Sequence, residues 1–481
     1  MTGHETQRLG EALAQLGRVH FVGVGGVGMS AVARVMVARG VPVSGSDAKD
    51  LPIMRDLAAL GARIAVGYDA AHLGDAETVV AGSAIRPDNP ELAEARARGL
   101  RVLHRSEGLA AAMAGSRVLA VAGTHGKTTT TSMATWMLRG AGLDPSFAIG
   151  ANVPALGVNA ASGTTDVFVA EADESDASFL NYRPLVEIIT NVEADHLDHY
   201  GTAEAVHAAF DAFAGLLPRE GLLVACADDP GARGVAERLR AAARETNDGG
   251  PRVVLYGTSA GADLRLTQDA DGATLAWDGG AARLPLTVPG THNALNAAGA
   301  FAAVVLGLGA EPQAAAASLA TFTGAARRFE LKGEANGVRV YDDYAHHPTE
   351  VRAALAAARS VAGTGRVHVL FQPHLFSRTR EFAAEFAQAL SVADTVRVLE
   401  IYPAREDPIP GVTSRLVTDA LPDGAYAASP EDAVGEIAAL ASPGDIVLTV
   451  GAGDVTAQGP ALVAALRARA TAAGKAESPD G

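Results

Sequence analysis

The stretch from Arg117 to Thr131, RVLAVAGTHGKTTTT, constrains the fold of this chain more than any other. Its apolar, β-branched first half predicts a buried strand, and the glycines that follow predict a tight turn into a threonine-rich helix. The backbone N–H groups of such a turn, together with the N-terminus of the helix, bind phosphate. The stretch therefore predicts a strand–loop–helix unit of an α/β protein, with a phosphate-binding loop at its centre.

The side chains of this loop have expected parts in nucleotide binding. Lys127 would reach the terminal phosphates, and the hydroxyl of Thr128 would bind Mg²⁺. The spacing is G-x-x-G-K-T instead of the usual G-x-x-x-x-G-K-[ST], because Val121 stands where the first glycine would be. A plain turn with a surface lysine is the alternative. The predicted ATP-binding residues of the loop are Gly123, Thr124, His125, Gly126, Lys127, Thr128 and Thr129.

A second glycine-rich turn lies nearer the N-terminus. A predicted strand runs through Gly23 to Gly28, GVGGVG, into a predicted helix, and this setting is typical of a Rossmann-like nucleotide-binding unit. Asp47, after the next predicted strand, is placed for a ribose hydroxyl. Ser83 and Arg105 also follow predicted strands, at the edge where open α/β sheets bind ligands. Helix capping and solvation are the alternative for these two residues.

Acidic residues follow two predicted strands of the central region. The strand over 166–170 continues into EADESD (171–176), and the strand over 186–192 includes and continues into NVEADH (191–196). Mg²⁺ is a hard cation that takes oxygen ligands, so carboxylates beside a phosphate loop fit it. A solvated acidic turn is the alternative. The sequence thus predicts metal-competent side chains at one edge of a sheet.

Two later regions complete the organisation. Short alternating runs over 251–289 predict a small antiparallel meander. Asn293 and Asn296 lie three residues apart at the start of an alanine-rich helix, so both face the same way, towards a nucleotide or simply as helix caps. From about Gly324, strands and helices alternate again, and the strand over 338–341 ends in DDYAHHP.

Composition excludes several classes of protein. The formal net charge of −16 argues against a nucleic-acid partner, which would need a basic surface. The single cysteine, Cys226, excludes an intrachain disulfide and is compatible with a reducing compartment. The N-terminus lacks the pattern of a signal peptide, and the longest apolar run, 297–310, is too short to span a bilayer. We therefore expect a cytoplasmic protein without a membrane partner.

A family resemblance covers essentially the whole chain. The motifs that carry it, in chain order, are GVGGVGMSAVA, SGSD, GTHGKTTTT, EADESDASF, NVEADHLDHY, HNALNAAGA, ARRFE, DDYAHHPTEV and FQPHLFSRTR. In these motifs the chain resembles the muramyl ligases of peptidoglycan synthesis, and most closely the branch that adds the first amino acid.

The resemblance implies an α/β fold of three domains. These would be an N-terminal Rossmann-like domain that binds a UDP-sugar (1–113), a central P-loop ATPase domain with a parallel sheet plus the meander (114–323), and a C-terminal Rossmann-like domain (324–481). Composition adds a disordered tail from about residue 470.

The reaction implied is ATP-dependent amide formation between L-alanine and the lactyl carboxylate of UDP-N-acetylmuramate, through an acyl phosphate. The implied cofactors are ATP and two Mg²⁺ ions, and a monomer and a homodimer both stay open. In this interpretation the first glycine-rich turn binds the diphosphate of the UDP-sugar instead of a dinucleotide.

The resemblance also implies roles residue by residue. The implied catalytic residues are Lys127, Glu171, His196 and Arg328; Thr128 and Glu171 would hold the first Mg²⁺ and His196 the second. ATP would further contact Asn293, Asn296, Arg328 and Asp343. The UDP-sugar would contact Gly25, Gly26, Val27, Gly28, Asp47, Ser83 and Arg105. The muramyl carboxylate and alanine would contact His346, His347, Arg378 and Arg380.

One departure from the wider family is informative. Later-acting members hold the second metal with a carbamoylated lysine beyond the histidine that matches His196, but no lysine occurs here between Lys127 and Lys332. This resembles the alanine-adding branch. Three rivals stay open: a recycling ligase that adds a whole tripeptide, an NAD-linked oxidoreductase built on the first turn, and a catalytically silent nucleotide-binding scaffold. An oxidoreductase would leave the Lys127 loop without a role.

Overall fold

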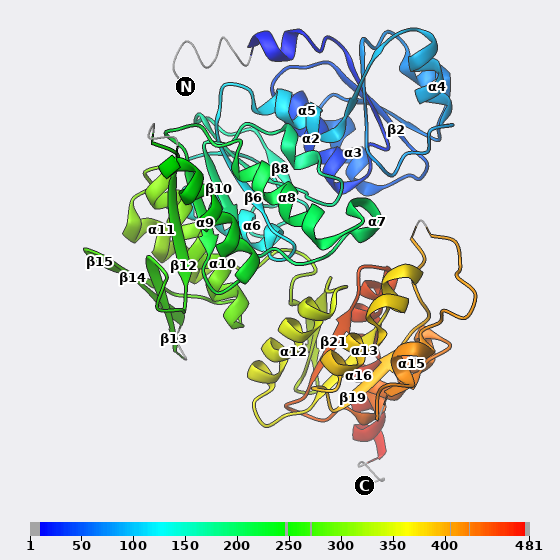
Figure 1. Cartoon of the computed structure of the whole chain (residues 1–481). Helices are drawn as coiled ribbons and strands as arrows, with labels where there is room; N and C mark the ends of the chain where they lie inside the picture. The colour runs from blue at the N-terminus through cyan, green and yellow to red at the C-terminus, as the bar shows by residue number, and fades with distance from the viewer. Residues whose placement is uncertain (1–9, 246–248, 270–271, 405, 423, 477–481) are drawn as a thin grey trace. The chain divides into compact units, whose positions relative to one another are not determined.

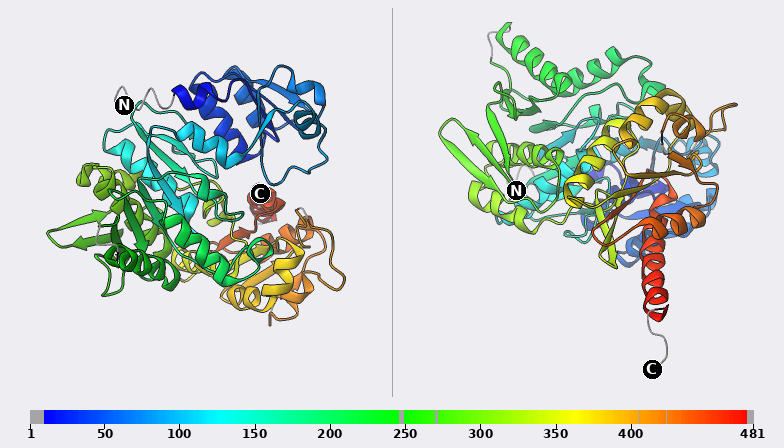
Figure 2. Two further views of the ribbon diagram at one scale, coloured as in Figure 1. Left: turned by 45° about the horizontal axis from the view of Figure 1, so that its top comes forward. Right: turned by 90° about the horizontal axis from the view of Figure 1, so that it is seen from below.

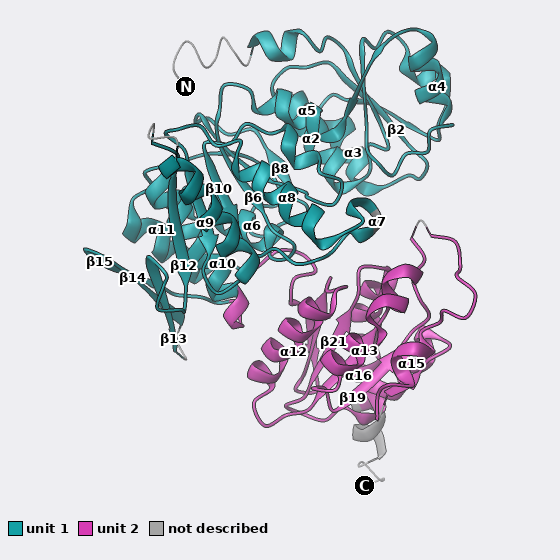
Figure 3. Cartoon of the chain, viewed as in Figure 1, with its two compact units in different colours: residues 1–287, 293–323 teal, residues 288–292, 324–481 magenta. Residues whose placement is uncertain are grey.

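The chain folds into two compact units, and each of them has the predicted α/β class of fold (Figures 1 and 3). The computed structural model describes residues 10–245, 249–269, 272–404, 406–422 and 424–476. The first unit comprises Met1–Thr287 and Asn293–Thr323, and the second comprises Val288–His292 and Gly324–Gly481. Helices cover the sheets of each unit in the further views of Figure 2, and each unit is described by itself.

The first unit begins with a five-stranded parallel sheet in the order β3-β2-β1-β4-β5. Its central strand β1 is buried along its whole length, which its apolar sequence VHFV favours. The strand order reverses beside β1, and ligands of open α/β sheets bind at such a point. The elements are β1 (Val19–Val22), α2 (Val27–Ala38), β2 (Val43–Asp47), α3 (Pro52–Ala59), β3 (Arg63–Val66), β4 (Thr78–Ala81), α4 (Pro90–Ala97), β5 (Arg101–His104) and α5 (Arg105–Met113).

The second sheet of this unit has ten strands in the order β15-β14-β13-β12-β11-β10-β6-β9-β7-β8. Strand β6 lies between β10 and β9, and all three run parallel, so the three segments that follow them meet at one edge. The strands are β6 (Arg117–Ala122), β7 (Ser146–Ala148), β8 (Ala160–Ala161), β9 (Val167–Glu171), β10 (Val186–Ile189), β11 (Leu222–Cys226), β12 (Arg252–Gly257), β13 (Leu264–Asp269), β14 (Gly272–Trp277) and β15 (Gly280–Leu284).

The predicted antiparallel meander is confirmed, because β13, β14 and β15 pair antiparallel at the end of the sheet (Figure 1). Helices surround this sheet, and α6 follows the phosphate loop directly. The helices are α6 (Lys127–Gly140), α7 (Leu197–Tyr200), α8 (Ala203–Ala214), α9 (Pro230–Glu245), α10 (Thr291–Ala302) and α11 (Pro312–Ser318).

The second unit contains a six-stranded sheet in the order β16-β17-β21-β18-β19-β20, parallel except for β16. Both faces are apolar: Val369 packs in a core with α12 and α13, and the adjacent Leu370 packs in a core with α15 and α16. The elements are β16 (Glu330–Ala335), β17 (Val338–Asp343), α12 (Pro348–Ala362), β18 (Val367–Phe371), α13 (Phe376–Leu390), β19 (Thr395–Val398), α14 (Arg415–Thr418), β20 (Gly424–Tyr426), α15 (Pro430–Leu440), β21 (Ile446–Val450) and α16 (Gln458–Ala476).

Two further expectations concern the C-terminal tail and the absence of membrane-spanning helices. Helix α16 continues to Ala476, and residues 477–481 lie outside the described residues, so the disordered tail stays a prediction. In the part of the chain that the structure describes, no helix is both long and apolar enough to cross a membrane.

Candidate active site

The conformation of the phosphate loop explains its two glycines. Gly123 has a φ of +139° and Gly126 a φ of +83°, which residues with a side chain rarely adopt. A Cβ atom at Gly123 would clash with Thr190 Oγ1, and one at Gly126 would lie 2.7 Å from Asn296 Oδ1. The loop is therefore closely packed between the end of β10 and helix α10, and α6 begins directly after it.

Residues that follow β10 hold this loop in place. Asn191 accepts the N–H of His125 at 2.7 Å and donates to the His125 carbonyl at 3.1 Å. Thr190 Oγ1 donates to the same carbonyl at 2.6 Å, and the N–H of Glu193 donates to Thr124 Oγ1 at 2.9 Å. Thr190 and Asn191 were not among the predicted site residues. Their signal was their position after a strand adjacent to β6.

Lys127 lies within the loop and is held by it. Its Nζ donates to the carbonyls of Gly123 at 2.7 Å and Thr124 at 3.1 Å, and to Glu174 Oε1 at 2.8 Å. Burial lowers the pKa of Lys127, but the negative charges of Glu174 and Asp173 raise it by more, so the pKa lies above its ordinary value. The lysine therefore stays charged at neutral pH.

The predicted ligands of the first metal ion lie together. Thr128 Oγ1 donates to Glu171 Oε1 at 2.9 Å, and Glu171 Oε2 accepts the N–H of Gly150 at 2.6 Å. Glu171 reaches this place because it ends β9, opposite Val121 of β6. A hydroxyl and a carboxylate oxygen are donors that suit Mg²⁺.

His196 lies beside a different carboxylate. Its Nε2 is 3.6 Å from Glu174 Oε1 and 3.8 Å from Asp195 Oδ2. Burial lowers the pKa of His196, but the bond to Glu174 and the charge of Asp195 raise it by more. Glu174, whose side chain is 2% exposed, thus contacts both Lys127 and His196. Sequence reasoning singled out Glu171 from the same acidic run and missed Glu174.

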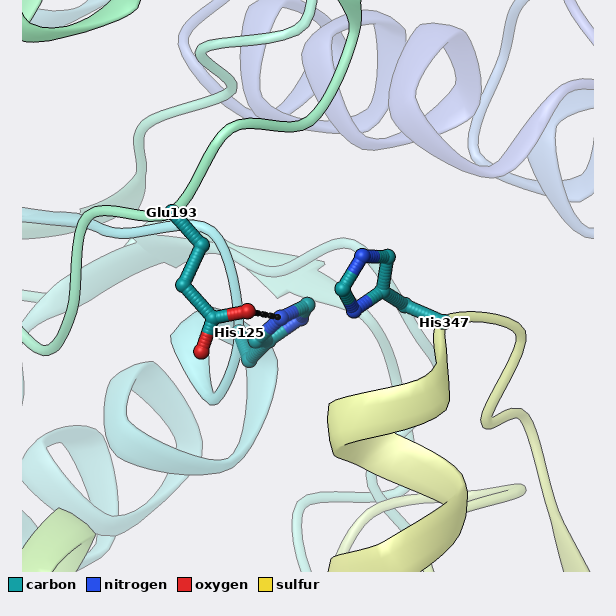
Figure 4. Close-up of side chains that lie close together, drawn as sticks. All are labelled: His125, Glu193 and His347. Atoms are coloured by element: carbon teal, nitrogen blue, oxygen red, sulfur yellow. Dashed lines mark hydrogen bonds and ion pairs between the residues drawn. The ribbon is translucent and has the colours of Figure 1, made fainter. Parts of the chain in front are cut away.

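Three more predicted ATP-binding residues lie in or beside the loop, namely His125, Asn293 and Asn296. His125 Nε2 lies 3.3 Å from Glu193 Oε2, and a dashed line marks this contact in Figure 4; His347, which is also drawn there, belongs to the second unit. Asn293 and Asn296 are buried at the start of α10, with Asn296 Nδ2 3.5 Å from Asn293 Oδ1. Since Asn296 also lies against Gly126, the second turn of α10 reaches the phosphate loop.

The glycine-rich turn of the first sheet is held by the end of β2. The N–H groups of Gly23 and Val24 donate to the Ser46 carbonyl at 2.8 and 2.9 Å. The N–H of Gly25 donates to Asp47 Oδ2 at 3.0 Å. Asp47 therefore lies at the turn, as predicted. Gly26 caps α2, and Val27, its first residue, is 48% exposed.

Arg105 and Ser83 both contact the acidic segment that follows β9 of the central sheet. Arg105 lies so close to Gly28 that a Cβ there would be 2.8 Å from its Nη1, and its Nη2 donates to Asp173 Oδ2 at 3.0 Å. Ser83 Oγ donates to Asp176 Oδ2 at 2.5 Å. Arg105 thus lies between the first glycine-rich turn and the segment that carries Glu174, and Ser83 contacts the same segment.

In the second unit, Arg328 and Asp343 lie at the carboxyl end of β17. The Arg328 guanidinium lies 5.2 Å from the centre of the Tyr344 ring and its Nη1 is 3.9 Å from Glu350 Oε1. Asp343 accepts the N–H groups of Phe329 and Ala345, each at 2.8 Å. Burial raises the pKa of Asp343 to about 6.

The four residues predicted to contact the muramyl carboxylate and alanine differ in their surroundings. His346 Nδ1 lies 3.4 Å from Glu350 Oε2, and burial lowers the pKa of His346 to about 3. His347 caps α12 by accepting the N–H of Thr349 at 3.4 Å. Two residues apart on α13, Arg378 is buried and Arg380 is exposed, so the helix turns them to different sides. The structure does not bring these two arginines together.

Comparisons with known proteins agree with this architecture. Three family models match in succession: "Mur ligase family, catalytic domain" over residues 18–117, "Mur ligase middle domain" over 121–304 and "Mur ligase, glutamate ligase domain" over 327–453. The chain is 70% identical over 455 residues to a UDP-N-acetylmuramate–L-alanine ligase of Paenarthrobacter aurescens (strain TC1), which covers 94% of this chain and 98% of that relative.

Solved structures give the same result. A UDP-N-acetylmuramate-alanine ligase from Thermotoga maritima is 28% identical with a TM-score of 0.75, covering 94% of this chain and 99% of that one. A murein peptide ligase from Psychrobacter arcticus is 26% identical with a TM-score of 0.68, covering 94% and 98%. The resemblance found in the motifs is thus confirmed, as is the organisation into three α/β domains.

Proposed function

Because this chain belongs to the Mur ligase family, we propose that it joins L-alanine to the lactyl carboxylate of UDP-N-acetylmuramate in an ATP-dependent reaction. The observation that carries this assignment is the 70% identity, over 94% of the chain, to a relative that bears the name of that ligase. This reaction adds the first amino acid in the synthesis of a peptidoglycan precursor.

The chemistry requires activation because a carboxylate has no usable leaving group. A lactyl carboxylate oxygen attacks the γ-phosphorus of ATP, ADP leaves, and an acyl phosphate forms. The amine of L-alanine then attacks the acyl carbon, and inorganic phosphate leaves from the tetrahedral intermediate as the nitrogen loses a proton. Most of the protein's contribution to such a reaction is positioning and charge stabilisation.

Lys127 is the residue that stabilises the transferring phosphoryl group. Its position supports this role, because its Nζ lies in the loop, bonded to the Gly123 and Thr124 carbonyls and to Glu174. An ammonium held there faces the negative charge that develops on phosphate oxygens. Arg328 and Asp343 of the second unit, with Asn293 and Asn296 of the first, complete the ATP contacts.

The donor set around the loop fits Mg²⁺. Thr128 and Glu171, whose side-chain oxygens lie 2.9 Å apart, would hold the first ion, and His196, with Glu174 beside it, would hold a second. When bound, the ions neutralise charge on the phosphate oxygens.

The three substrates, UDP-N-acetylmuramate, ATP and L-alanine, bind to different parts of the chain. Residues 1–113 hold the UDP-sugar, with its diphosphate on the Gly25–Gly28 turn near Asp47, Ser83 and Arg105. Residues 114–323 hold ATP, and residues 324–481 supply Arg328 and Asp343. His346, His347, Arg378 and Arg380 are the proposed contacts of the muramyl carboxylate and of alanine. The enzyme acts in the cytoplasm. It is a monomer or a homodimer.

Phosphate release tests the assignment. The enzyme is supplied with ATP, Mg²⁺ and UDP-N-acetylmuramate, and L-alanine is compared with the tripeptide L-Ala-γ-D-Glu-meso-diaminopimelate as the nucleophile. We expect turnover with L-alanine. Turnover with the tripeptide alone would contradict the proposal and make the protein a recycling ligase with the same fold and chemistry.

A further inference from the structure

Arg328 stands between two residues with unusual backbone conformations. Arg327 has a φ of +59° and Phe329 a φ of +50°. A positive φ is unfavourable for residues that carry a side chain, and it persists only where the surroundings impose it. Such residues gather at functional sites. The contacts that impose this conformation therefore indicate which residues fix the direction of Arg328.

The side chain of Arg327 provides most of these contacts. Its Nη2 donates to the carbonyls of Gly451 at 2.6 Å and Gly453 at 3.1 Å, in the segment that follows β21. Its Nε donates to Asp342 Oδ2 at 3.3 Å, and its guanidinium lies 4.8 Å from the centre of the Tyr344 ring. The planar guanidinium presents five donors in a fixed fork, so one side chain connects three segments of the second unit.

The partner carboxylate is itself held firmly. Asp342 is completely buried, and it accepts Thr449 Oγ1 at 2.6 Å and Thr456 Oγ1 at 2.7 Å. A buried carboxylate needs such hydrogen bonds to offset the loss of water. Asp342 therefore offers Arg327 a fixed, buried acceptor near the carboxyl end of β17.

The backbone on either side of Arg328 is held as well. The carbonyl of Arg327 accepts the N–H of Tyr344 at 2.7 Å, and the N–H of Phe329 donates to Asp343 Oδ2 at 2.8 Å. The Phe329 ring stacks on Tyr341 with centroids 4.5 Å apart. The Tyr344 ring has the Arg328 guanidinium near it as well as that of Arg327.

We propose that Arg327 is a positioning residue, which holds Arg328 in the orientation used for phosphoryl transfer by tying residues 327–329 to Asp342 and to the 451–453 segment. The inference rests on the proposed function, in which Arg328 contacts ATP. Arg327 acts only through Arg328, since its own donors are directed at Asp342 and at carbonyl groups of the protein.

A matched control exists in the same unit. Arg359 also pairs with a carboxylate, Asp394, at 2.7 Å, and donates to the carbonyl of Val392 at 2.9 Å. Asp394 accepts the N–H of Val367, the first residue of β18, so this pair lies at the amino end of the parallel strands. Arg328 and Asp343 lie at the opposite end. An arginine with a purely structural role is therefore represented by Arg359.

The experiment compares Arg327→Lys, Asp342→Asn and Arg359→Lys in the full-length chain. Steady-state phosphate release gives kcat and the KM of each substrate, and thermal unfolding monitors the fold. For Arg327→Lys we expect kcat to fall about 100-fold, as for a misplacement of about 1 Å, while the KM of UDP-N-acetylmuramate stays within about twofold. Asp342→Asn should lower kcat by a smaller factor, and Arg359→Lys should keep the kcat of the unchanged enzyme.

Two results would overturn the inference. One is an unchanged kcat in both Arg327→Lys and Asp342→Asn; the other is an equal loss of kcat in Arg359→Lys, which would mean that any loosening of the unit has the same effect. Failure of the proposed function is a separate result, since it appears as turnover of the unchanged enzyme with the tripeptide alone. In that case, the kcat values of the variants and of the unchanged enzyme are compared with the tripeptide as the nucleophile.

Discussion

Two glycine-rich loops in the first unit follow the same plan and differ in their side chains. The Gly23–Gly28 turn joins β1 to α2, and the Gly123–Gly126 loop joins β6 to α6, so each leads from a buried parallel strand to the start of a helix. The N–H groups of the first turn are held by Ser46 and Asp47. The second loop adds Lys127 and Thr128, with Glu171 and Glu174 beside them.

The difference separates binding a phosphate from transferring one. Backbone N–H groups at a helix start suffice to bind a diphosphate. During transfer, the negative charge on the oxygens of the phosphoryl group must also be stabilised. This requires a cation beside the loop and ligands for a metal ion. Three adjacent parallel strands, β9, β6 and β10, deliver those groups to the second loop. We interpret the first turn as a holding site and the second as a reacting site.

The largest expected effect comes from Lys127→Ala, which removes the cation of the second loop. We expect kcat to fall by about 10³-fold or more with the KM of UDP-N-acetylmuramate nearly unchanged, and the melting temperature to fall as well, because the buried Glu174 carboxylate loses its Lys127 partner. Phosphate release and thermal unfolding measure both. The matched control is Lys49→Ala, since Lys49 is exposed just beyond Asp47 and its N–H donates to that carboxylate at 3.3 Å. Equal loss of activity in both variants would remove the distinction between the loops.

Glu171→Gln should have the next largest effect. It replaces a charged oxygen of the proposed metal site with a neutral group while it keeps the size of the side chain. We expect kcat to fall by roughly 10- to 100-fold and to recover in part at higher Mg²⁺ concentration. Titration of activity with Mg²⁺ measures this. The same Mg²⁺ dependence in the variant and the unchanged enzyme would refute the assignment of Glu171 as a ligand.

Asp47→Asn tests the holding site and should act on binding alone. Loss of the charge at the first turn should raise the KM of UDP-N-acetylmuramate by about tenfold, with kcat and the KM of ATP unchanged, as expected when uniform binding is lost. Initial rates at varied substrate concentration check it. A fall in kcat without a change in KM would place Asp47 in the reacting machinery instead.

The smallest expected effect concerns stability near the second loop. Glu187 of β10 is completely buried, and neither of its carboxylate oxygens has a hydrogen-bond partner among the described residues. Burial raises its pKa well above the ordinary value. A carboxyl whose pKa is higher in the folded state favours folding below its unfolded pKa, and this contribution is lost as the pH rises through the folded pKa.

Glu187→Gln should therefore gain stability relative to the unchanged protein as the pH rises. We expect the difference in melting temperature to shift in favour of the variant by about 2 °C or more between pH 5 and pH 8, with kcat unaltered. Thermal unfolding at the two pH values measures it. A difference that does not depend on pH would show that Glu187 keeps the same protonation state in the folded and unfolded chain.

The class of fold and much of the site could be predicted from the sequence. The glycine turns gave the positions of strand, loop and helix, and Thr128 and Glu171 were expected together and lie 2.9 Å apart. This worked because parallel strands that follow one another in a sheet bring their carboxyl ends to one edge.

The side chains that support the site could not be predicted in the same way. Glu174 and Asn191 lie in the turns that follow β9 and β10, and the path of those turns depends on tertiary contacts. The sequence EADESD alone does not show which of its carboxylates faces the phosphate loop. Arg378 and Arg380 were predicted to act together, but residues two apart on a helix point to different sides. Arg378 is buried and Arg380 is exposed. The positive φ values at Arg327 and Phe329 are likewise imposed by distant residues, since the partner carbonyls of Arg327 lie at 451 and 453. The proposed roles of these residues stay predictions.

The most direct test of the two-loop account measures binding without turnover. Calorimetric titration gives the Kd of UDP-N-acetylmuramate and, separately, of a non-hydrolysable ATP analogue with Mg²⁺, for Lys127→Ala and for Asp47→Asn. The account predicts that Lys127→Ala weakens only the ATP analogue and that Asp47→Asn weakens only the UDP-sugar. Weakening of both ligands by either substitution, or the reverse pairing, would contradict the claim that the two loops hold different substrates.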